Sequence, residues 1–191
     1  MKKINWLLVV SLVVIGLLMI DVILLTIQNS ELKTTISNLT QRQTEPLRRG
    51  EKVEPFKIQT LSGDTAEFTY PDTTKRYLLF VLSTRCPHCE KNLPSWKDIA
   101  KSSNSDVHIF GISTDNFELT RQYASTKDIG FYIASIADTS FGRKYKISGV
   151  PETILIDGNS TVEKVWIGEL SEERVNEIKN LMGATIICVE K

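Results

Sequence analysis

The stretch "LLFVLSTRCPHCEKNLPSW", residues 78–96, places two cysteines between an apolar run and a helix-forming segment. The run at 77–83 has the length of a strand and no charged residue, as in a central strand buried on both faces. Pro87 suits the first turn of a helix, because the N–H that it lacks has no partner there in any case. The sequence therefore predicts a strand, then Cys-x-x-Cys, then a helix, with Cys86 at the helix N-terminus and Cys89 one turn further in.

This placement favours a reactive thiol. The unpaired N–H groups and the macrodipole of a helix N-terminus stabilise a thiolate at Cys86, and Arg85 and a charged His88 add positive charge nearby. Such conditions lower a cysteine pKa below its ordinary value of about 8.5. We therefore expect Cys86 to be the nucleophile and Cys89 the resolving thiol. The Pro87-His88 dipeptide predicts a more oxidising couple than a neutral dipeptide would give.

A metal site and a structural disulfide are the competing explanations for this cysteine pair. A zinc ion requires about four ligands, whereas the chain has no second Cys-x-x-Cys, and its one other histidine, His108, falls in an expected strand. A copper ion held by two thiols and a histidine suits soft ligands. A structural disulfide at this spacing would close a tight, strained loop. Redox exchange without a metal or cofactor is the favoured interpretation, and copper is the strongest of the alternatives.

The N-terminus carries a second signal. Lys2 and Lys3 precede an apolar run at 6–27, whose 22 residues include one charge, Asp21. As a helix this run would measure about 33 Å, enough to cross a bilayer core of about 30 Å. We expect a cytoplasmic N-terminus at 1–5, a membrane anchor at 6–27 and the rest of the chain outside the cytosol. A cleaved signal peptide is the alternative.

The remainder of the chain divides into a polar linker and one domain. The 23 basic and 23 acidic residues balance, so nothing indicates a nucleic-acid partner. Residues 28–52 are polar and are interpreted as a solvated stalk, although Leu25, Leu32 and Leu39 recur every seven residues, as in a helical dimer seam. A domain at 53–191 follows. Its last cysteine, Cys188, lies in an apolar tail and is interpreted as a buried, inert thiol.

Hydrophobic periodicity and turn residues predict the elements of the domain. A hairpin begins the domain and a second hairpin precedes its last helix, with helices and strands alternating between them, which indicates a mixed sheet covered by helices. We expect strands at 56–60, 66–70, 77–83, 106–113, 131–135, 153–157 and 161–168, and helices at 87–102, 116–127, 139–146 and 171–182.

A second motif is "ISGVPETILID", residues 147–157, in which Val150-Pro151 precedes an apolar strand. An X-Pro bond takes the cis form at modest cost. A cis Pro151 would leave the backbone groups of Val150 free to pair with an extended substrate. The dipeptide by itself is also compatible with an ordinary trans turn.

Together, "FVLSTRCPHCEKNLP" and the later "GVPETILID" resemble the thioredoxin superfamily, and more closely its membrane-anchored TlpA/ResA-like thiol–disulfide oxidoreductases, over about residues 50–182. The resemblance implies an α/β thioredoxin-like fold with an N-terminal β-hairpin extension. It also implies that Cys86 is the nucleophile, that Cys89 resolves, and that Pro151 is cis beside their disulfide.

The same resemblance implies partners and a location. The partners would be protein thiols and disulfides of the cell envelope, as in cytochrome c maturation, and a membrane electron donor or acceptor of the CcdA/DsbD type. The domain would be extracytoplasmic, on the periplasmic or outer face. Three departures leave the direction of electron flow open. Arg85 replaces the usual Trp, the Pro-His dipeptide is typical of DsbA oxidases, and Asn92 stands where a Glu is often found.

Two other families are weighed as alternatives. Peroxidases of the peroxiredoxin type resemble Pro-x-x-x-Thr/Ser-x-x-Cys, and Ser83 fits that pattern before Cys86, but Leu79 occupies the Pro position. Copper-delivery proteins of the Sco type resemble Cys-x-x-x-Cys with a distant His, and the spacing here is one residue short. Thiol–disulfide exchange is the function that the sequence favours.

Overall fold

The computed structural model describes residues 10, 12, 14–26 and 45–183. The chain divides into two units, residues 1–43 and 44–191, and each is considered by itself. Three predictions fall partly or wholly outside the described residues: the anchor at 6–27, the stalk at 28–52 and the tail that contains Cys188.

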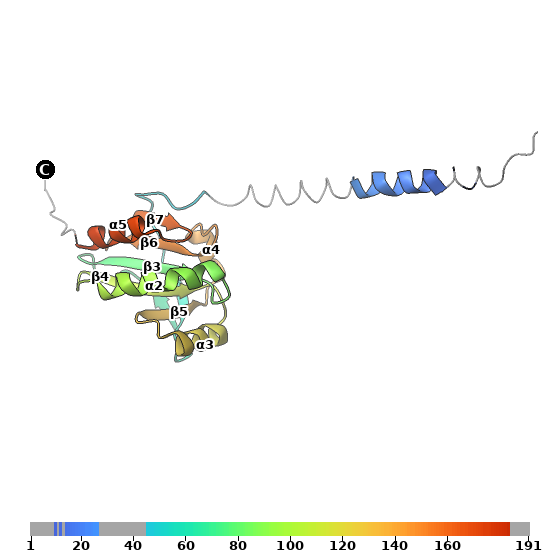
Figure 1. The fold of residues 1–191 in the computed structure, drawn as a ribbon. Coiled ribbons are helices and arrows are strands. Elements are labelled where there is room, and N and C mark those ends of the chain that lie inside the picture. The colour runs from blue at the N-terminus through green and yellow to red at the C-terminus, as the bar shows by residue number, and fades with distance from the viewer. Residues whose placement is uncertain (1–9, 11, 13, 27–44, 184–191) are drawn as a thin grey trace, which may run out of the picture. The chain divides into compact units, whose positions relative to one another are not determined.

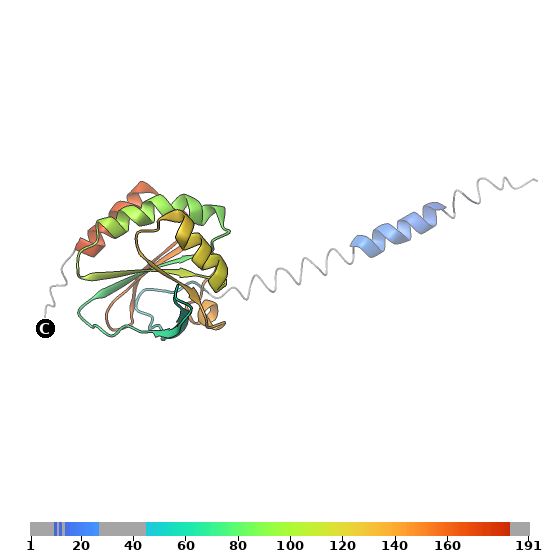
Figure 2. The same cartoon turned by 90° about the horizontal axis from the view of Figure 1, so that it is seen from below.

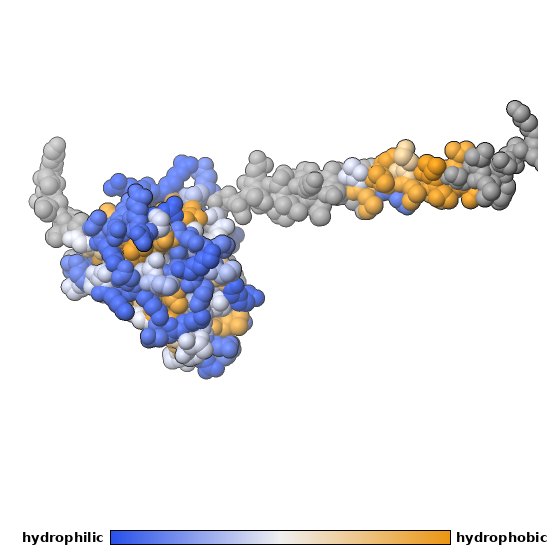
Figure 3. Space-filling view, in the orientation of Figure 1, coloured by the Kyte–Doolittle hydropathy of each residue, from blue (hydrophilic) through white to orange (hydrophobic). Residues whose placement is uncertain are grey.

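The described part of the first unit is a helix at residues 14–26 whose surface is mostly apolar (Figure 3). Large aliphatic side chains along it are exposed, including Leu17 at 59% and Met19 at 62%. Among the described residues, no helix has both the length and the hydropathy that a membrane crossing requires.

The second unit is built on a seven-stranded sheet in the order β2-β1-β5-β4-β3-β6-β7 (Figure 1). Strands β3, β4 and β5 are parallel to one another, while β6 runs antiparallel to β3 and each terminal hairpin is antiparallel. The sheet is therefore mixed, as predicted. The strands are β1 Phe56–Gln59, β2 Thr65–Phe68, β3 Arg76–Leu82, β4 Val107–Ser113, β5 Tyr132–Ile136, β6 Glu152–Ile156 and β7 Val162–Ile167.

The helices also follow the prediction, with one shorter than expected. They are α2 Pro87–Lys101, α3 Phe117–Lys127, α4 Phe141–Lys144 and α5 Glu172–Gly183. Asn116 caps α3 as expected, since its side chain accepts a hydrogen bond from the Leu119 N–H. The helix predicted at 139–146 contracts to a single turn, because Lys146 adopts a positive φ of 47° and the chain leaves the helical path there.

Helices α2, α3 and α5 cover one face of the sheet, and α4 lies on the other with the residues that precede β1 (Figure 2). Strand β3 is buried on both sides, as its apolar run predicted. Leu78, Phe80 and Leu82 face the three-helix layer, whereas Leu79 and Val81 face the layer of α4. The Cys-x-x-Cys segment that follows β3 is therefore anchored in the centre of the domain.

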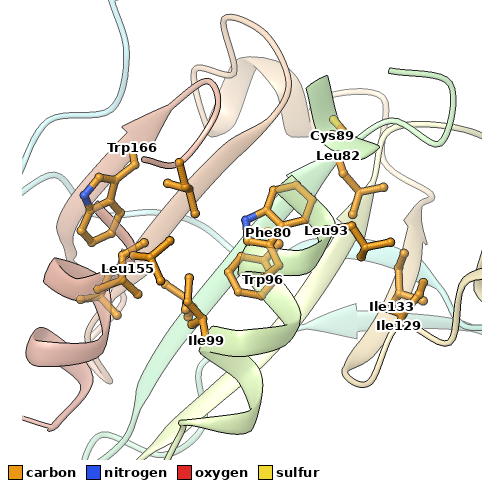
Figure 4. Close-up of a cluster of buried hydrophobic side chains, with 14 of the residues drawn as sticks. Phe80, Leu82, Cys89, Leu93, Trp96, Ile99, Ile129, Ile133, Leu155 and Trp166 are labelled. Atoms are coloured by element: carbon orange, nitrogen blue, oxygen red, sulfur yellow. The ribbon is translucent and has the colours of Figure 1, made fainter. Parts of the chain in front are cut away.

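A buried contact ties α2 to the sheet (Figure 4). The rings of Phe80 and Trp96 stack with centroids 5.1 Å apart and an interplanar angle of 18°. Trp96 Nε1 also donates a hydrogen bond of 3.1 Å to Thr153 Oγ1 on β6. Trp96 thus connects the helix that begins at the cysteines with the strand that begins after Pro151.

Candidate active site

Cys86 is the N-cap of α2, with φ −88° and ψ 117°, and Pro87 occupies the first turn. The Cys86 carbonyl accepts the N–H of Glu90 at 3.2 Å, and no side-chain hydrogen bond caps the helix. Cys86 is partly exposed, while Cys89, one turn further in, is 1% exposed. The structure therefore gives the two thiols the positions that the sequence predicted, one accessible and one shielded.

The two thiols also differ in their hydrogen bonds. Cys86 Sγ donates to the Val150 carbonyl oxygen at 3.5 Å, and the Ser83 N–H donates to Cys89 Sγ at 3.5 Å. Burial raises the pKa of Cys89 to about 12, opposed by the Ser83 N–H and reinforced by Cys86. Cys89 is consequently a protonated thiol at neutral pH.

The Val150–Pro151 peptide bond is cis, as the resemblance implied. Val150 is half-buried and Pro151 is buried. The contact between Cys86 Sγ and the Val150 carbonyl brings this bond beside the first cysteine, although the two lie 64 positions apart in the chain. The structure thus assembles the two motifs at one site.

Asp115, which follows β4, holds the loop between β3 and α2. One of its oxygens, Oδ2, accepts hydrogen bonds from Ser83 Oγ at 2.8 Å, from the Thr84 N–H at 2.6 Å and from Thr84 Oγ1 at 2.9 Å. The other, Oδ1, accepts from Arg85 Nε at 3.2 Å and Nη2 at 2.9 Å. Burial alone would raise the pKa of Asp115, but these hydrogen bonds outweigh it and lower the pKa.

This arrangement changes what Arg85 does at the site. The sequence predicted a positive charge beside Cys86, but the Arg85 guanidinium pairs with a carboxylate whose side chain is 3% exposed. The positive charge is therefore opposed by Asp115, whose own charge helps to raise the pKa of Cys89.

His88 likewise has an acidic partner. Its Nδ1 lies 2.6 Å from Glu169 Oε1, and Lys91 Nζ lies 3.2 Å from the same oxygen. Hydrogen bonds from His88 and Lys91 lower the pKa of Glu169, so the carboxylate is ionised and the His88 nitrogen donates. All three side chains are substantially exposed.

Glu152, the residue after Pro151, is a buried acid whose pKa is shifted in the opposite direction to those of Asp115 and Glu169. It is 0% exposed, and neither side-chain oxygen has a hydrogen-bond partner. Its strand neighbours are Val81 on β3 and Ile167 on β7. Burial raises its pKa to about 7, with a smaller opposing effect from the Ser148 backbone.

The sequence interpretation missed these three acids as parts of the site. A signal for Asp115 exists, because the carboxyl ends of neighbouring parallel strands meet at one edge of a sheet, and β3 and β4 were predicted as consecutive buried strands. Glu152 lies within the quoted motif, but nothing local reveals that it lacks a partner. Glu169 is far from the cysteines in the chain, and no sequence pattern links it to His88.

Potential metal ligands do not form a cluster in the described part of the chain. Within residues 10, 12, 14–26 and 45–183, no three or more His, Cys, Asp or Glu side chains are grouped as a metal ion would require.

Comparison with known proteins places the chain in a family. The Redoxin family matches residues 48–182. The chain is 27% identical over 137 residues to the thiol-disulfide oxidoreductase ResA of Halalkalibacterium halodurans, covering 71% of this chain and 77% of that protein. It is 23% identical over 127 residues to the sporulation thiol-disulfide oxidoreductase A of Bacillus subtilis, covering 64% and 76%.

The solved structure of StoA from Bacillus subtilis superimposes with a TM-score of 0.55 at 19% identity, covering 65% of this chain and 96% of that one. This likeness shows the fold, a thioredoxin-like mixed sheet with helices on both faces. The family match extends over more than half of the chain. The chain therefore belongs to the Redoxin family and is a ResA-like member of the thioredoxin superfamily.

Proposed function

We propose that Cys86 and Cys89 are the dithiol through which this thiol–disulfide oxidoreductase exchanges electrons with cysteines of extracytoplasmic proteins. The observation that carries the proposal is the asymmetry of the two thiols. Cys86 is accessible at a helix N-terminus, and Cys89 is buried with its pKa raised to about 12. An attacking thiolate and a resolving thiol require this difference.

The exchange proceeds in two displacements. The Cys86 thiolate attacks one sulfur of a substrate disulfide, so that the substrate S–S bond breaks and a mixed disulfide forms at Cys86. Cys89 then attacks the Cys86 sulfur, and its proton ends on the departing substrate thiolate. Two electrons have passed to the substrate, which is reduced, and Cys86–Cys89 is oxidised. The reverse sequence oxidises a substrate dithiol.

The Val150 carbonyl oxygen supplies a place for the substrate backbone. In the reduced protein it accepts the Cys86 S–H at 3.5 Å. Once Cys86 joins a mixed disulfide, it has no proton to donate, and the carbonyl becomes free to accept an N–H from an extended substrate. The backbone pairing predicted for Val150 would thus become available when the covalent intermediate forms.

We further propose that residues 6–27 anchor the protein in the cell membrane, with 28–52 as a tether and the domain at 53–191 facing the envelope. The apolar run and the resemblance to membrane-anchored relatives support this arrangement. Apocytochrome c is a candidate substrate, and a membrane protein of the CcdA/DsbD type is a candidate redox partner.

The test compares Cys89→Ala with Cys86→Ala in intact cells, trapping free thiols with acid and separating proteins on non-reducing gels. We expect Cys89→Ala to accumulate mixed disulfides, because the resolving thiol is absent, and Cys86→Ala to accumulate none. Equal trapping by both variants would show that the roles are wrong. A wild-type protein that consumes peroxide but forms no mixed disulfides would favour the peroxidase alternative.

A further inference from the structure

The loop between β7 and α5 is held against α2 by Asn92, which is 2% exposed. Asn92 Nδ2 donates to the Gly168 carbonyl at 3.2 Å, and Asn92 Oδ1 accepts the Leu170 N–H at 2.8 Å. One buried side chain therefore holds the backbone on both sides of Glu169, at Gly168 and at Leu170. The Gly168 N–H also donates to the Pro151 carbonyl at 2.9 Å, which ties the loop to the site.

The fixed loop presents the Glu169 carboxylate to the dipeptide between the cysteines. The distance from His88 Nδ1 to Glu169 Oε1 is 2.6 Å, and Lys91, one helical turn from His88, adds a second contact of 3.2 Å. From α5, Arg174 Nη1 donates a hydrogen bond of 3.4 Å to the backbone carbonyl of Glu169 on the loop. The ring of His88 is thus hydrogen-bonded to the loop, while the Cys86 sulfur is hydrogen-bonded to Val150.

This geometry bears on the direction of electron flow. A cation free to approach the Cys86 thiolate stabilises the reduced protein and makes the disulfide a stronger oxidant. A carboxylate that binds the same cation has the opposite effect, because it cancels part of the charge and holds the ring in a hydrogen bond to the loop. Resting on the proposed function, we propose that Glu169 is a positioning residue that holds His88 away from Cys86 and makes the couple less oxidising than its Pro-His dipeptide predicts.

The experiment measures the reduction potential of the full chain in detergent, equilibrated with glutathione buffers at one fixed pH. We expect Glu169→Gln to shift the equilibrium with glutathione threefold or more toward the reduced protein. For a two-electron couple this is about 14 mV in the oxidising direction. The side chains of Glu169 and His88 are 43% and 61% exposed, so solvent screening keeps the expected shift modest.

Two further variants show whether Glu169 acts through His88. In a His88→Ala background, Glu169→Gln should shift the potential less than it does in the wild type, because there is no ring to release. Glu118→Gln is the matched control. It removes an exposed carboxylate that pairs with Arg121 at 2.8 Å on α3, and we expect no shift.

The outcomes separate this inference from the proposed function. If the wild type has a two-electron couple but Glu169→Gln leaves its potential unchanged or lowers it, the role of Glu169 is wrong and the proposed function stands. Equal shifts with and without His88 would show that Glu169 acts only as a remote charge, which also contradicts the inference. A wild type with no two-electron couple would overturn the proposed function itself.

Discussion

Two acids near the cysteines show how hydrogen-bond partners decide the charge of a buried carboxyl group. Asp115 receives hydrogen bonds from three consecutive residues, 83–85, and its pKa is lowered. At Glu152 only the Ser148 backbone opposes the effect of burial, and the pKa is raised to about 7. Burial raises the pKa of both carboxyl groups, and only at Asp115 do the hydrogen bonds outweigh it. Asp115 shapes the loop before Cys86 as an anion, whereas Glu152 is neutral below pH 7.

We expect Glu152 to make the stability of the domain depend on pH. Its pKa in the folded protein, about 7, lies above the ordinary 4.5, so the folded state binds the proton more tightly. The stabilisation is complete below pH 4.5 and is lost as the pH rises through 7. In the wild type we expect the unfolding free energy to fall by at most about 3 kcal/mol across this range. In Glu152→Gln, whose side chain does not titrate, we expect this fall to be absent.

Urea denaturation of both proteins at several pH values between 4.5 and 8 measures this effect. Glu118→Gln, an exposed carboxylate on α3, is the control and should follow the wild-type curve. Parallel curves for Glu152→Gln and wild type would show that the carboxyl group of Glu152 does not titrate in this range.

At the scale of elements, the position of α2 decides the geometry of the site. Cys86 begins this helix, and the helix is held over the sheet by the stacking of Trp96 on Phe80 and by its hydrogen bond to Thr153. Because Thr153 lies two residues after Pro151, the same contact fixes the spacing between the two motifs. The positions of Cys86 and Pro151 therefore depend on the packing of Trp96 and Thr153.

Thr153→Val tests the hydrogen bond between Trp96 and Thr153. The substitution preserves the shape of the side chain but leaves the Trp96 N–H buried without an acceptor, since Trp96 is 0% and Thr153 1% exposed. We expect a loss of roughly 1–3 kcal/mol in unfolding free energy, measured by urea denaturation.

A double-mutant cycle isolates the hydrogen bond. Trp96→Phe with Thr153→Val should be less destabilised than the sum of the single variants, because no N–H is then left unpaired. Thr65→Val, on the exposed β2, is the control and should change stability little. Strict additivity of the two core substitutions would show that the hydrogen bond contributes no coupling.

At the scale of the whole molecule, an apolar helix and a redox domain belong to one chain. The described part of the helix exposes its aliphatic side chains, while the domain buries its own in two cores on either side of the sheet. Exposed apolar surface of this extent is typical of a surface that meets a protein partner or a membrane. A bilayer around residues 6–27 would cover it and would confine the domain to the membrane surface.

Fractionation of cells tests the anchor. We expect the full chain to remain with membranes after an alkaline carbonate wash, and Ile15→Arg with Leu18→Arg to move it to the soluble fraction. Arginine near the centre of a spanning helix costs about 2.5–3.5 kcal/mol per residue. The matched pair Ile15→Leu with Leu18→Ile should remain with the membranes. A soluble wild-type protein would contradict the proposed anchor.

The sequence by itself determined the order of strands and helices in the described domain, the two hairpins and the placement of Cys86 and Cys89 at the start of α2. These features depend on hydrophobic periodicity, turn residues and Pro87, all of which act between neighbours in the chain. The cis form of Pro151 was implied by the family resemblance, and the structure confirms it.

Only the tertiary structure decided which groups the charged residues meet. Arg85 binds Asp115 across 30 positions and His88 binds Glu169 across 81, while Glu152 has no side-chain partner. Such pairings depend on the sheet order, which sets strands distant in sequence side by side. A charge has no preferred partner until the fold brings one within about 4 Å, so local sequence carries the chemistry of the cysteines but not the electrostatics that tune it.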